Sequence, residues 1–343
     1  MTVPVVLVVF AIVASVLGPR LLRRGDWLSR SPRMGIFAWQ ALSGSVLLSA
    51  LLAGAALAVP ALPATASLAE FLQSCLMLLK AQYSTPGGAA AGITGAVLAV
   101  TVLARYGFCL ARCVVSARSS RLEQLRSLAL VARRNDRYGV LVVDHPVAAA
   151  YCLPGRGRQI VLTTAVLDAL DEEQLSAVLA HERAHLRGRH DLVMAGAEAL
   201  EQAFPRVPAF RAARLELARL IELQADDTAV RRYPRLTVAS ALVRLAEGGA
   251  APASALGAGG HSALMRVRRL AAPSNPLGPG RRAAIALAAA ALLAGPVVLA
   301  AVPAAGIAHD YSCPPAAVAS HEDMAALGCL PAAQACPEGA GRS

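Results

Sequence analysis

Charged residues are scarce in this chain of 343 residues, where Asp, Glu, Lys and Arg together make up only 16%. Soluble domains hold about 25%. Aromatic residues contribute 4%, apolar residues reach 56%, and the mean hydropathy is +0.52. This balance disfavours a soluble globule, a disordered chain and a collagen-like fibre. The composition therefore predicts a membrane protein that carries one soluble domain.

Lysine is almost absent, since Lys80 is the single lysine and arginine carries the remaining positive charge. The formal net charge of +11 fits either nucleic acid or an anionic membrane face. In a chain this apolar, we adopt the membrane interpretation. Nothing in the sequence resembles a nucleic-acid-binding motif, so we expect no direct nucleic-acid binding.

Four apolar segments are long enough to cross a lipid bilayer, which takes about 20 residues in a helix. They cover residues 3–22, 35–59, 88–110 and 283–308. The first segment could be a cleavable signal peptide, but no basic residue precedes its apolar run, which favours an uncleaved anchor. The sequence thus predicts a membrane region in residues 1–110 with three helices, and a fourth membrane helix near the C-terminus.

Arginine clusters indicate which side of the membrane each loop occupies, because short cytoplasmic loops are enriched in positive charge. Residues 19–34, at the end of the first segment and after it, hold five arginines, whereas Lys80 is the only basic residue in residues 60–87. We therefore expect a multi-pass protein of the cell membrane, with a domain over residues 111–282 in the cytoplasm and the tail, residues 309–343, outside. The abundance of arginine and alanine indicates a bacterial source.

The seven cysteines divide along this predicted topology. Four of them are expected outside the cell, where oxidising conditions allow disulfides; these are Cys75, Cys313, Cys329 and Cys336. Their spacing does not determine a pairing, and free thiols in the tail are the alternative. Cys152 lies in the predicted domain, and we interpret it as a small core residue and not as a nucleophile.

Residues 111–282 mix strand and helix patterns. Strands are predicted over Tyr138–Asp144 and Gln159–Thr164, with a turn over Tyr151–Gly157. The next helix has the clearest start, because Asp171 and Gln174 form a capping box, and we expect Gly188 to end it. Further helices are predicted over residues 121–134, 191–204, 209–232, 236–247 and 261–270.

The capped helix contains His181-Glu182-Arg183-Ala184-His185, an HExxH motif. Residues i and i+4 share a helix face, so both imidazoles can bind one Zn²⁺ ion. Glu182 follows the first ligand and can take a proton from metal-bound water as that water attacks a carbonyl. With only 7 histidines in the chain, this pattern rarely arises by chance, which disfavours a purely structural role.

A catalytic zinc site needs a third protein ligand and one open position. The extended motif HExxHxxGxxH would place a third histidine at position 191. This chain has Asp191 there, so the extended motif is absent. On the predicted helix over residues 209–232, Glu222 and Asp226 share a face. Glu222 can bind zinc, and Asp226 can accept the free N–H of a zinc-bound histidine. A solvated acidic face is the alternative interpretation of this pair.

Peptide hydrolysis also needs a donor to the oxyanion of the transition state, such as Tyr, His or Arg. Tyr233 and His190 are candidates because they lie near the motifs in the sequence, although a structural role fits both. The other histidines, His145, His261, His309 and His321, show no ligand spacing, and we do not expect them to bind metal.

The motif followed by Glu222 and Asp226 resembles the gluzincin pattern HExxH…ExxxD, and Tyr151–Thr164 followed by Leu175–His185 resembles the membrane zinc peptidases. HtpX-like quality-control proteases usually carry membrane helices in pairs around the domain. BlaR/MecR-like antirepressor proteases carry three membrane helices, a cytoplasmic zinc domain and a fourth helix. The predicted arrangement of three plus one therefore favours the BlaR/MecR-like group.

This resemblance implies an α-helical membrane protein with four transmembrane helices and a cytoplasmic α+β zincin-like metalloprotease domain. It implies a zinc-dependent endopeptidase that acts in signal transduction by cleaving a cytoplasmic protein, such as a winged-helix transcriptional repressor. It also implies that the strand Gln159–Thr164 is an edge beside the cleft, to which a substrate adds as an extended strand; an ordinary core strand is the alternative. Residues 309–343 lack the penicillin-binding sensor domain of that group, so we do not expect β-lactam sensing.

Two other functions compete with this interpretation. One is general quality control of membrane proteins, as in HtpX-like proteases. The other is a non-catalytic membrane receptor with a structural zinc ion. Glu182 argues against the receptor, because structural zinc sites are closed by four protein ligands and need no general base.

Overall fold

The structure, a computed structural model, describes residues 2–59, 77, 80, 83–155, 157–248 and 263–310, with side chains described up to residue 301. Cys75, Cys313, Cys329 and Cys336 lie outside these residues, as does His261, so the predictions about them stay predictions. Within the described part, three cysteines are free thiols: Cys109, Cys113 and Cys152.

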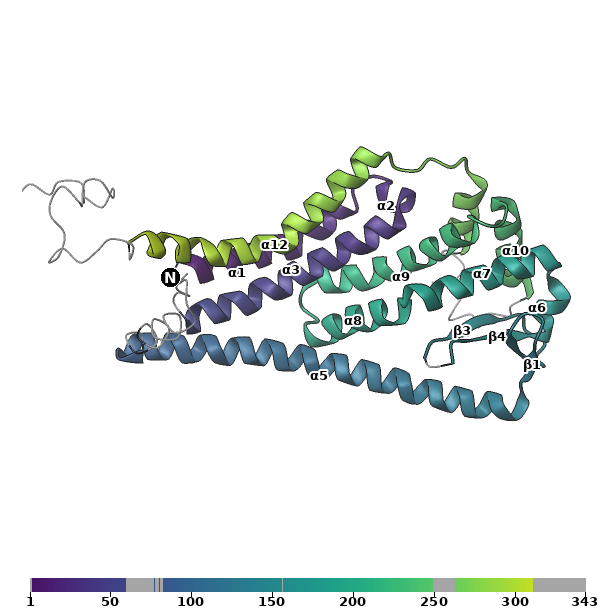
Figure 1. Ribbon diagram of the computed structural model, residues 1–343, viewed down its shortest axis with the longest axis horizontal. Coiled ribbons are helices and arrows are strands. Elements are labelled where there is room, and N and C mark those ends of the chain that lie inside the picture. The colour runs from purple at the N-terminus through teal and green to yellow at the C-terminus, as the bar shows by residue number, and fades with distance from the viewer. Residues whose placement is uncertain are drawn as a thin grey trace, which may run out of the picture.

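Four described helices are long and apolar enough to cross a membrane, which indicates membrane association. They are α1 (Thr2–Leu22), α3 (Pro32–Ala58), α5 (Pro86–Val131) and α12 (Pro279–Asp310), with the short helix α2 (Trp27–Arg30) between the first two. Both α3 and α5 begin with proline in the first turn, where its missing N–H would have no intrahelical partner. Three of these helices precede the sheet and one follows it (Figure 1).

Helix α5 is longer than the sequence predicts. Instead of a membrane helix ending near residue 110 and a separate helix over residues 121–134, one continuous helix covers 46 residues. Neither glycine nor proline occurs between Gly107 and Val131, so nothing in this stretch interrupts the helix. At 1.5 Å per residue it is about 69 Å long, more than twice the thickness of a bilayer core. Helix α5 therefore joins the candidate membrane helices directly to the sheet.

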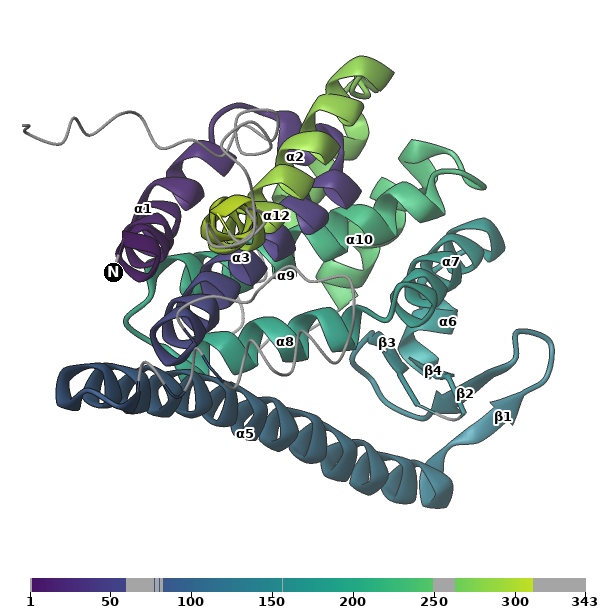
Figure 2. The same ribbon diagram turned by 60° about the vertical axis from the view of Figure 1, so that its left-hand side comes forward.

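A hairpin of helices α8 (His190–Ala203) and α9 (Pro208–Ala229) packs against the candidate membrane helices. Trp39 of α3 belongs to the same buried cluster as Phe210 and Leu220 of α9. Arg105 of α5 donates a hydrogen bond to the carbonyl oxygen of Ala203 at the end of α8. Figures 1 and 2 show α9 beside α3 and α8 beside α5. The α8–α9 hairpin and the candidate membrane helices thus share one apolar core.

Glycine allows α3 and α5 to approach closely. A Cβ added at Gly95 would lie 2.5 Å from the backbone oxygen of Gly54, so the two helices would have to separate. We expect Gly95→Ala to lower the free energy of unfolding by about 1–3 kcal/mol, the usual cost of overpacking. Denaturant titration of the purified chain in detergent measures this loss. Gly107→Ala in the same helix is the control, because an added Cβ there meets nothing within 4 Å; equal losses in both variants would contradict the prediction.

The sheet corrects two predictions. Its strands are β1 (Arg133–Asn135), β2 (Val140–Val143), β3 (Ala150–Leu153) and β4 (Gln159–Thr163), in the order β1-β2-β4-β3. The expected edge strand β4 is instead a central strand, paired with β2 and β3, and its buried side chains show that the core-strand alternative holds. The two edge strands are β1 and β3, and β3 lies in the segment predicted as a turn. The residues typical of a turn, Pro154 and Gly155, come after the end of β3.

Helices α6 (Thr164–Ala169), α7 (Glu172–Gly188) and α10 (Arg235–Gly248), with a further helix over residues 263–271, complete the described fold. The predicted capping box of α7 is confirmed, since Asp171 and Gln174 bond each other's backbone N–H groups. The predicted end of α7 differs, because Arg189 and not Gly188 takes the left-handed conformation, with φ of 48°. Glycine is required at position 188 for a different reason, because an added Cβ would collide with the ring of His190.

Candidate metal centre

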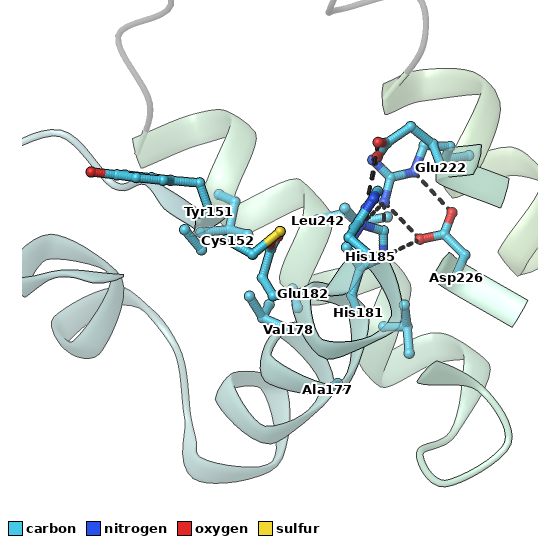
Figure 3. A pocket seen from close by; sticks show the side chains of 15 residues that line it. Tyr151, Cys152, Ala177, Val178, His181, Glu182, His185, Glu222, Asp226 and Leu242 are labelled. Carbon is cyan, nitrogen blue, oxygen red and sulfur yellow. Dashed lines mark hydrogen bonds and ion pairs between the residues drawn. The ribbon is translucent and has the colours of Figure 1, made fainter. Parts of the chain in front are cut away.

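Helices α7 and α9 bring three of the sequence-predicted ligands together. One ligand atom from each of His181, His185 and Glu222 lies within 4.8 Å of the other two. The Nε2 atoms of the two histidines are 3.1 Å apart, and each lies 3.5 Å from an oxygen of Glu222. Figure 3 shows these side chains converging from the two helices. HExxH spacing and the packing of α9 on α7 thus create one cluster of possible ligands.

The donor set fits a tetrahedral metal ion. Two imidazoles and one carboxylate are a ligand set found in catalytic zinc sites, with bonds of about 2.0–2.2 Å. Two such ligands on a tetrahedral ion are about 3.3 Å apart, and the observed separations of 3.1 and 3.5 Å bracket this value. The spacing of the three side chains therefore fits one zinc ion.

Asp226 contacts His181 on the ring nitrogen that faces away from Glu222. Its side chain is fully buried, and its carboxylate accepts a hydrogen bond from Nδ1 of His181 at 3.0 Å. A proton held at Nδ1 leaves the Nε2 lone pair free toward Glu222, where a metal ion would bind. Asp226 thus lies where it can accept the free N–H of a candidate ligand histidine, as its spacing from Glu222 predicts.

Arg266 is a residue of the site that sequence reasoning missed. It lies in the helix over residues 263–271 and donates to both oxygens of Asp226, at 2.8 and 2.6 Å. Its Nη1 donates to Glu222 at 2.9 Å, so it links two carboxylates that lie one helical turn apart. Only 12% of its side chain is exposed. Sequence spacing does not distinguish it from the neighbouring Arg268 and Arg269.

Negative charge exceeds positive charge among the described residues that line this pocket. Glu182, Glu222 and Asp226 are carboxylates, whereas Arg266 is the cationic lining residue. Buried charge is costly unless a partner balances it. A divalent cation that displaced the extra proton of His181 would balance the two carboxylates that remain after Arg266 is counted. This imbalance supports a metal site independently of the ligand spacing.

The two histidines of the motif differ in their affinity for protons. Burial alone would lower the pKa of His181, but hydrogen bonds with Asp226 and Glu222 raise it to about 9. Burial and the neighbouring charge of His181 lower the pKa of His185 to about 4. At neutral pH the metal-free His181 is therefore a cation with a proton on each ring nitrogen, and a metal ion that binds at Nε2 must displace the proton there.

Glu182 lies on the same helix and lines the pocket beside Cys152 of β3 (Figure 3). Burial raises the pKa of the Glu182 carboxyl. Burial and the adjacent Glu182 charge raise the pKa of the Cys152 thiol to about 12, so the thiol stays protonated and donates a hydrogen bond to Glu182. This agrees with the expectation that Cys152 is not a nucleophile, although it lines the pocket as well as packing on the core.

The structure does not bring the two predicted oxyanion donors to the pocket. Tyr233 packs against an apolar cluster that includes Ala229 and Val238. His190 is buried behind His185, and its Nδ1 lies 3.0 Å from Nδ1 of that ligand. Neither residue is among those that line the pocket. Of the described lining residues, Arg266 is the one that carries a permanent positive charge.

The candidate metal centre opens into a pocket of about 430 Å³. Ala150, Tyr151 and Cys152 of the edge strand β3 form one wall, and α10 forms another through Val238, Ala241, Leu242 and Leu245. Because β3 pairs only with β4 among the described strands, its other side can accept an extended peptide as a further strand. The pocket thus combines candidate metal ligands, a carboxylate base and a surface suited to a peptide.

Residues 117–205 match the model of Peptidase family M48. This M48 domain includes the end of α5, the sheet, α7 with its HExxH motif, and α8; Glu222 and Asp226 lie beyond it. No curated protein matches the chain, and no solved structure matches it. The M48 domain and the four apolar helices together indicate a membrane metalloprotease.

Proposed function

We propose that this protein is an integral-membrane zinc-dependent endopeptidase. The observation that carries this proposal is the convergence of His181, His185 and Glu222 beside Glu182, in a pocket bordered by β3, a strand at the edge of the described sheet. Zinc held by the three ligands would supply an activated water and polarise the carbonyl of the peptide bond. The open side of the pocket leaves room for that water and for the substrate.

Glu182 moves the proton in this mechanism. Its carboxylate takes the proton of the water as the water oxygen bonds to the carbonyl carbon. It then gives this proton to the leaving amine as the carbon–nitrogen bond breaks. A pKa raised by burial brings the carboxyl closer to neutral pH, which favours both transfers. The thiol of Cys152 and the guanidinium of Arg266 hold the surrounding carboxylates in place.

The substrate that we propose is an extended segment of a protein, added along β3. A cytoplasmic transcriptional repressor of the winged-helix class is our first choice, with the pocket on the cytoplasmic side of a bacterial cell membrane. The order of elements supports this choice, because three candidate membrane helices precede the domain and one follows it. Quality control of membrane proteins is the alternative.

Cleavage of an unstructured polypeptide by the full chain in detergent tests the proposed activity. We expect zinc-loaded protein to cut a quenched fluorescent polypeptide, a chelator to stop the reaction, and added Zn²⁺ to restore it. Activity no higher than that of a Glu182→Gln variant would overturn the proposal. Cleavage of a repressor at one site, with misfolded membrane proteins left intact, would separate the regulatory role from quality control.

The affinity for zinc should rise with pH. A proton occupies His181 below its pKa of about 9, and zinc must displace this proton, so each pH unit below that value should cost about tenfold in affinity. Above about pH 9 the dependence should level off. Competition titrations against a chromogenic chelator, corrected for protonation of the chelator, measure this slope. An affinity that stays constant between about pH 6.5 and 8.5 would contradict the proton-displacement argument.

A further inference from the structure

His185 has a hydrogen-bonding partner on each of its ring nitrogens. Nε2 faces His181 and Glu222, where the metal ion is proposed to bind. Nδ1 lies 3.0 Å from Nδ1 of His190, and the two rings meet edge to face at a centroid distance of 4.9 Å. His190 therefore contacts the metal ligand on the side away from the metal.

The two Nδ1 atoms are so close that one of them carries a proton and the other does not. Two nitrogens 3.0 Å apart form a hydrogen bond only if one donates and the other accepts. His185 must present the lone pair of Nε2 to a metal ion, so its own proton has to be at Nδ1. It follows that Nδ1 of His190 accepts and that the proton of His190 is at Nε2.

The surroundings of His190 show that its ring is held in this orientation. The residue is 5% exposed, and Gly188 leaves room for the ring where a Cβ would collide with it. Arg189 takes the left-handed conformation, which is uncommon for residues other than glycine, and so starts α8 with His190 behind the metal ligand. The Nε2 atom of His190 is buried without a hydrogen-bond partner among the described residues. Unfavourable features of this kind cluster at functional sites.

We propose that His190 is a positioning residue that fixes the tautomer and the ring orientation of His185. This inference rests on the proposed zinc site and assigns His190 a role different from oxyanion stabilisation. The two histidine ligands are then supported differently: the carboxylate of Asp226 orients His181, and a second imidazole orients His185. An imidazole adds no negative charge to a pocket already rich in carboxylates.

Zinc affinity of His190 variants tests this role. We expect His190→Ala to weaken zinc binding about 10–100-fold, the usual effect of losing an outer partner of a metal ligand. His190→Asn should recover most of the affinity, because the Asn oxygen reaches nearly the same position as Nδ1 and also accepts a hydrogen bond. Chelator competition gives the affinity, and the visible absorption of Co²⁺-loaded protein reports the ligand geometry; neither readout depends on peptidase activity.

A second variant leaves the histidine itself unchanged. Gly188→Ala should displace the ring of His190 and so weaken zinc binding and alter the Co²⁺ spectrum, as His190→Ala does. Gly196→Ala in α8 is the matched control, because the nearest atom to an added Cβ there is 4.0 Å away. If His190→Ala fails to fold, Gly188→Ala and His190→Asn decide the question.

The outcomes separate this inference from the proposed function. If His190→Ala keeps wild-type affinity while Glu222→Ala loses zinc, the role of His190 is refuted and the zinc site stands. Equal losses in His190→Ala and His190→Asn would also overturn it, since they would indicate a packing role. If Glu222→Ala, His181→Ala and His185→Ala all keep zinc, the proposed metal site itself fails.

Discussion

Glu182→Gln should abolish peptide hydrolysis while zinc stays bound. The amide cannot accept the proton of the attacking water, and general-base catalysis contributes about 10²–10⁴-fold to the rate. The ligands His181, His185 and Glu222 are unchanged, so metal content should remain that of the wild type. Measuring kcat on a quenched peptide, together with zinc content by mass spectrometry, tests both parts.

Glu173→Gln is the matched control for this variant. It makes the same substitution in the same helix, at an exposed position in the first turn. We expect it to keep both activity and zinc. If Glu182→Gln retained more than a few per cent of wild-type activity, another group would have to be the base. If it lost zinc as well, Glu182 would belong to the metal site and not to proton transfer.

Glu222→Ala should remove both zinc and activity. This substitution deletes the one ligand that α9 contributes to the site, so the loss of affinity should exceed the 10–100-fold expected for an outer partner. Chelator competition measures the affinity, and the peptide assay measures the activity. Asp226→Asn should have the smaller effect, because Asp226 contacts His181 and not the metal position.

Glu216→Ala provides the comparison on the same helix. Glu216 is a carboxylate of α9 that pairs with Arg23 and Arg219, away from the pocket. Its loss should leave zinc binding unchanged. Unchanged zinc content in Glu222→Ala would show that the third ligand lies elsewhere, and the proposed ligand set would then be wrong.

Local patterns in the sequence account for most of the candidate site. HExxH places His181 and His185 on one face because helical periodicity acts over four residues. The same spacing singled out Glu222 and Asp226, and the capping box at Asp171 identified the start of α7. These predictions depend only on residues a few positions apart in one helix, so they can be made from the sequence alone.

Long-range pairing accounts for what the sequence did not reveal. β3 is an edge strand because it pairs only with β4 among the described strands, and no pattern within Ala150–Leu153 predicts that pairing. Arg266 reaches Glu222 across 44 positions of the chain, so its contact depends on how the whole domain closes. Tyr233 and His190 lie near the motifs in the sequence, but neither is among the residues that line the pocket.

X-ray absorption at the zinc edge of the purified full chain tests the central claim most directly. The claim predicts one zinc ion per chain, with only nitrogen and oxygen neighbours at about 2.0–2.2 Å and the scattering pattern of two imidazoles. It would be contradicted by protein that holds no stoichiometric zinc, or by a sulfur neighbour at about 2.3 Å. Sulfur at that distance would make a cysteine such as Cys152 a ligand in place of the proposed set.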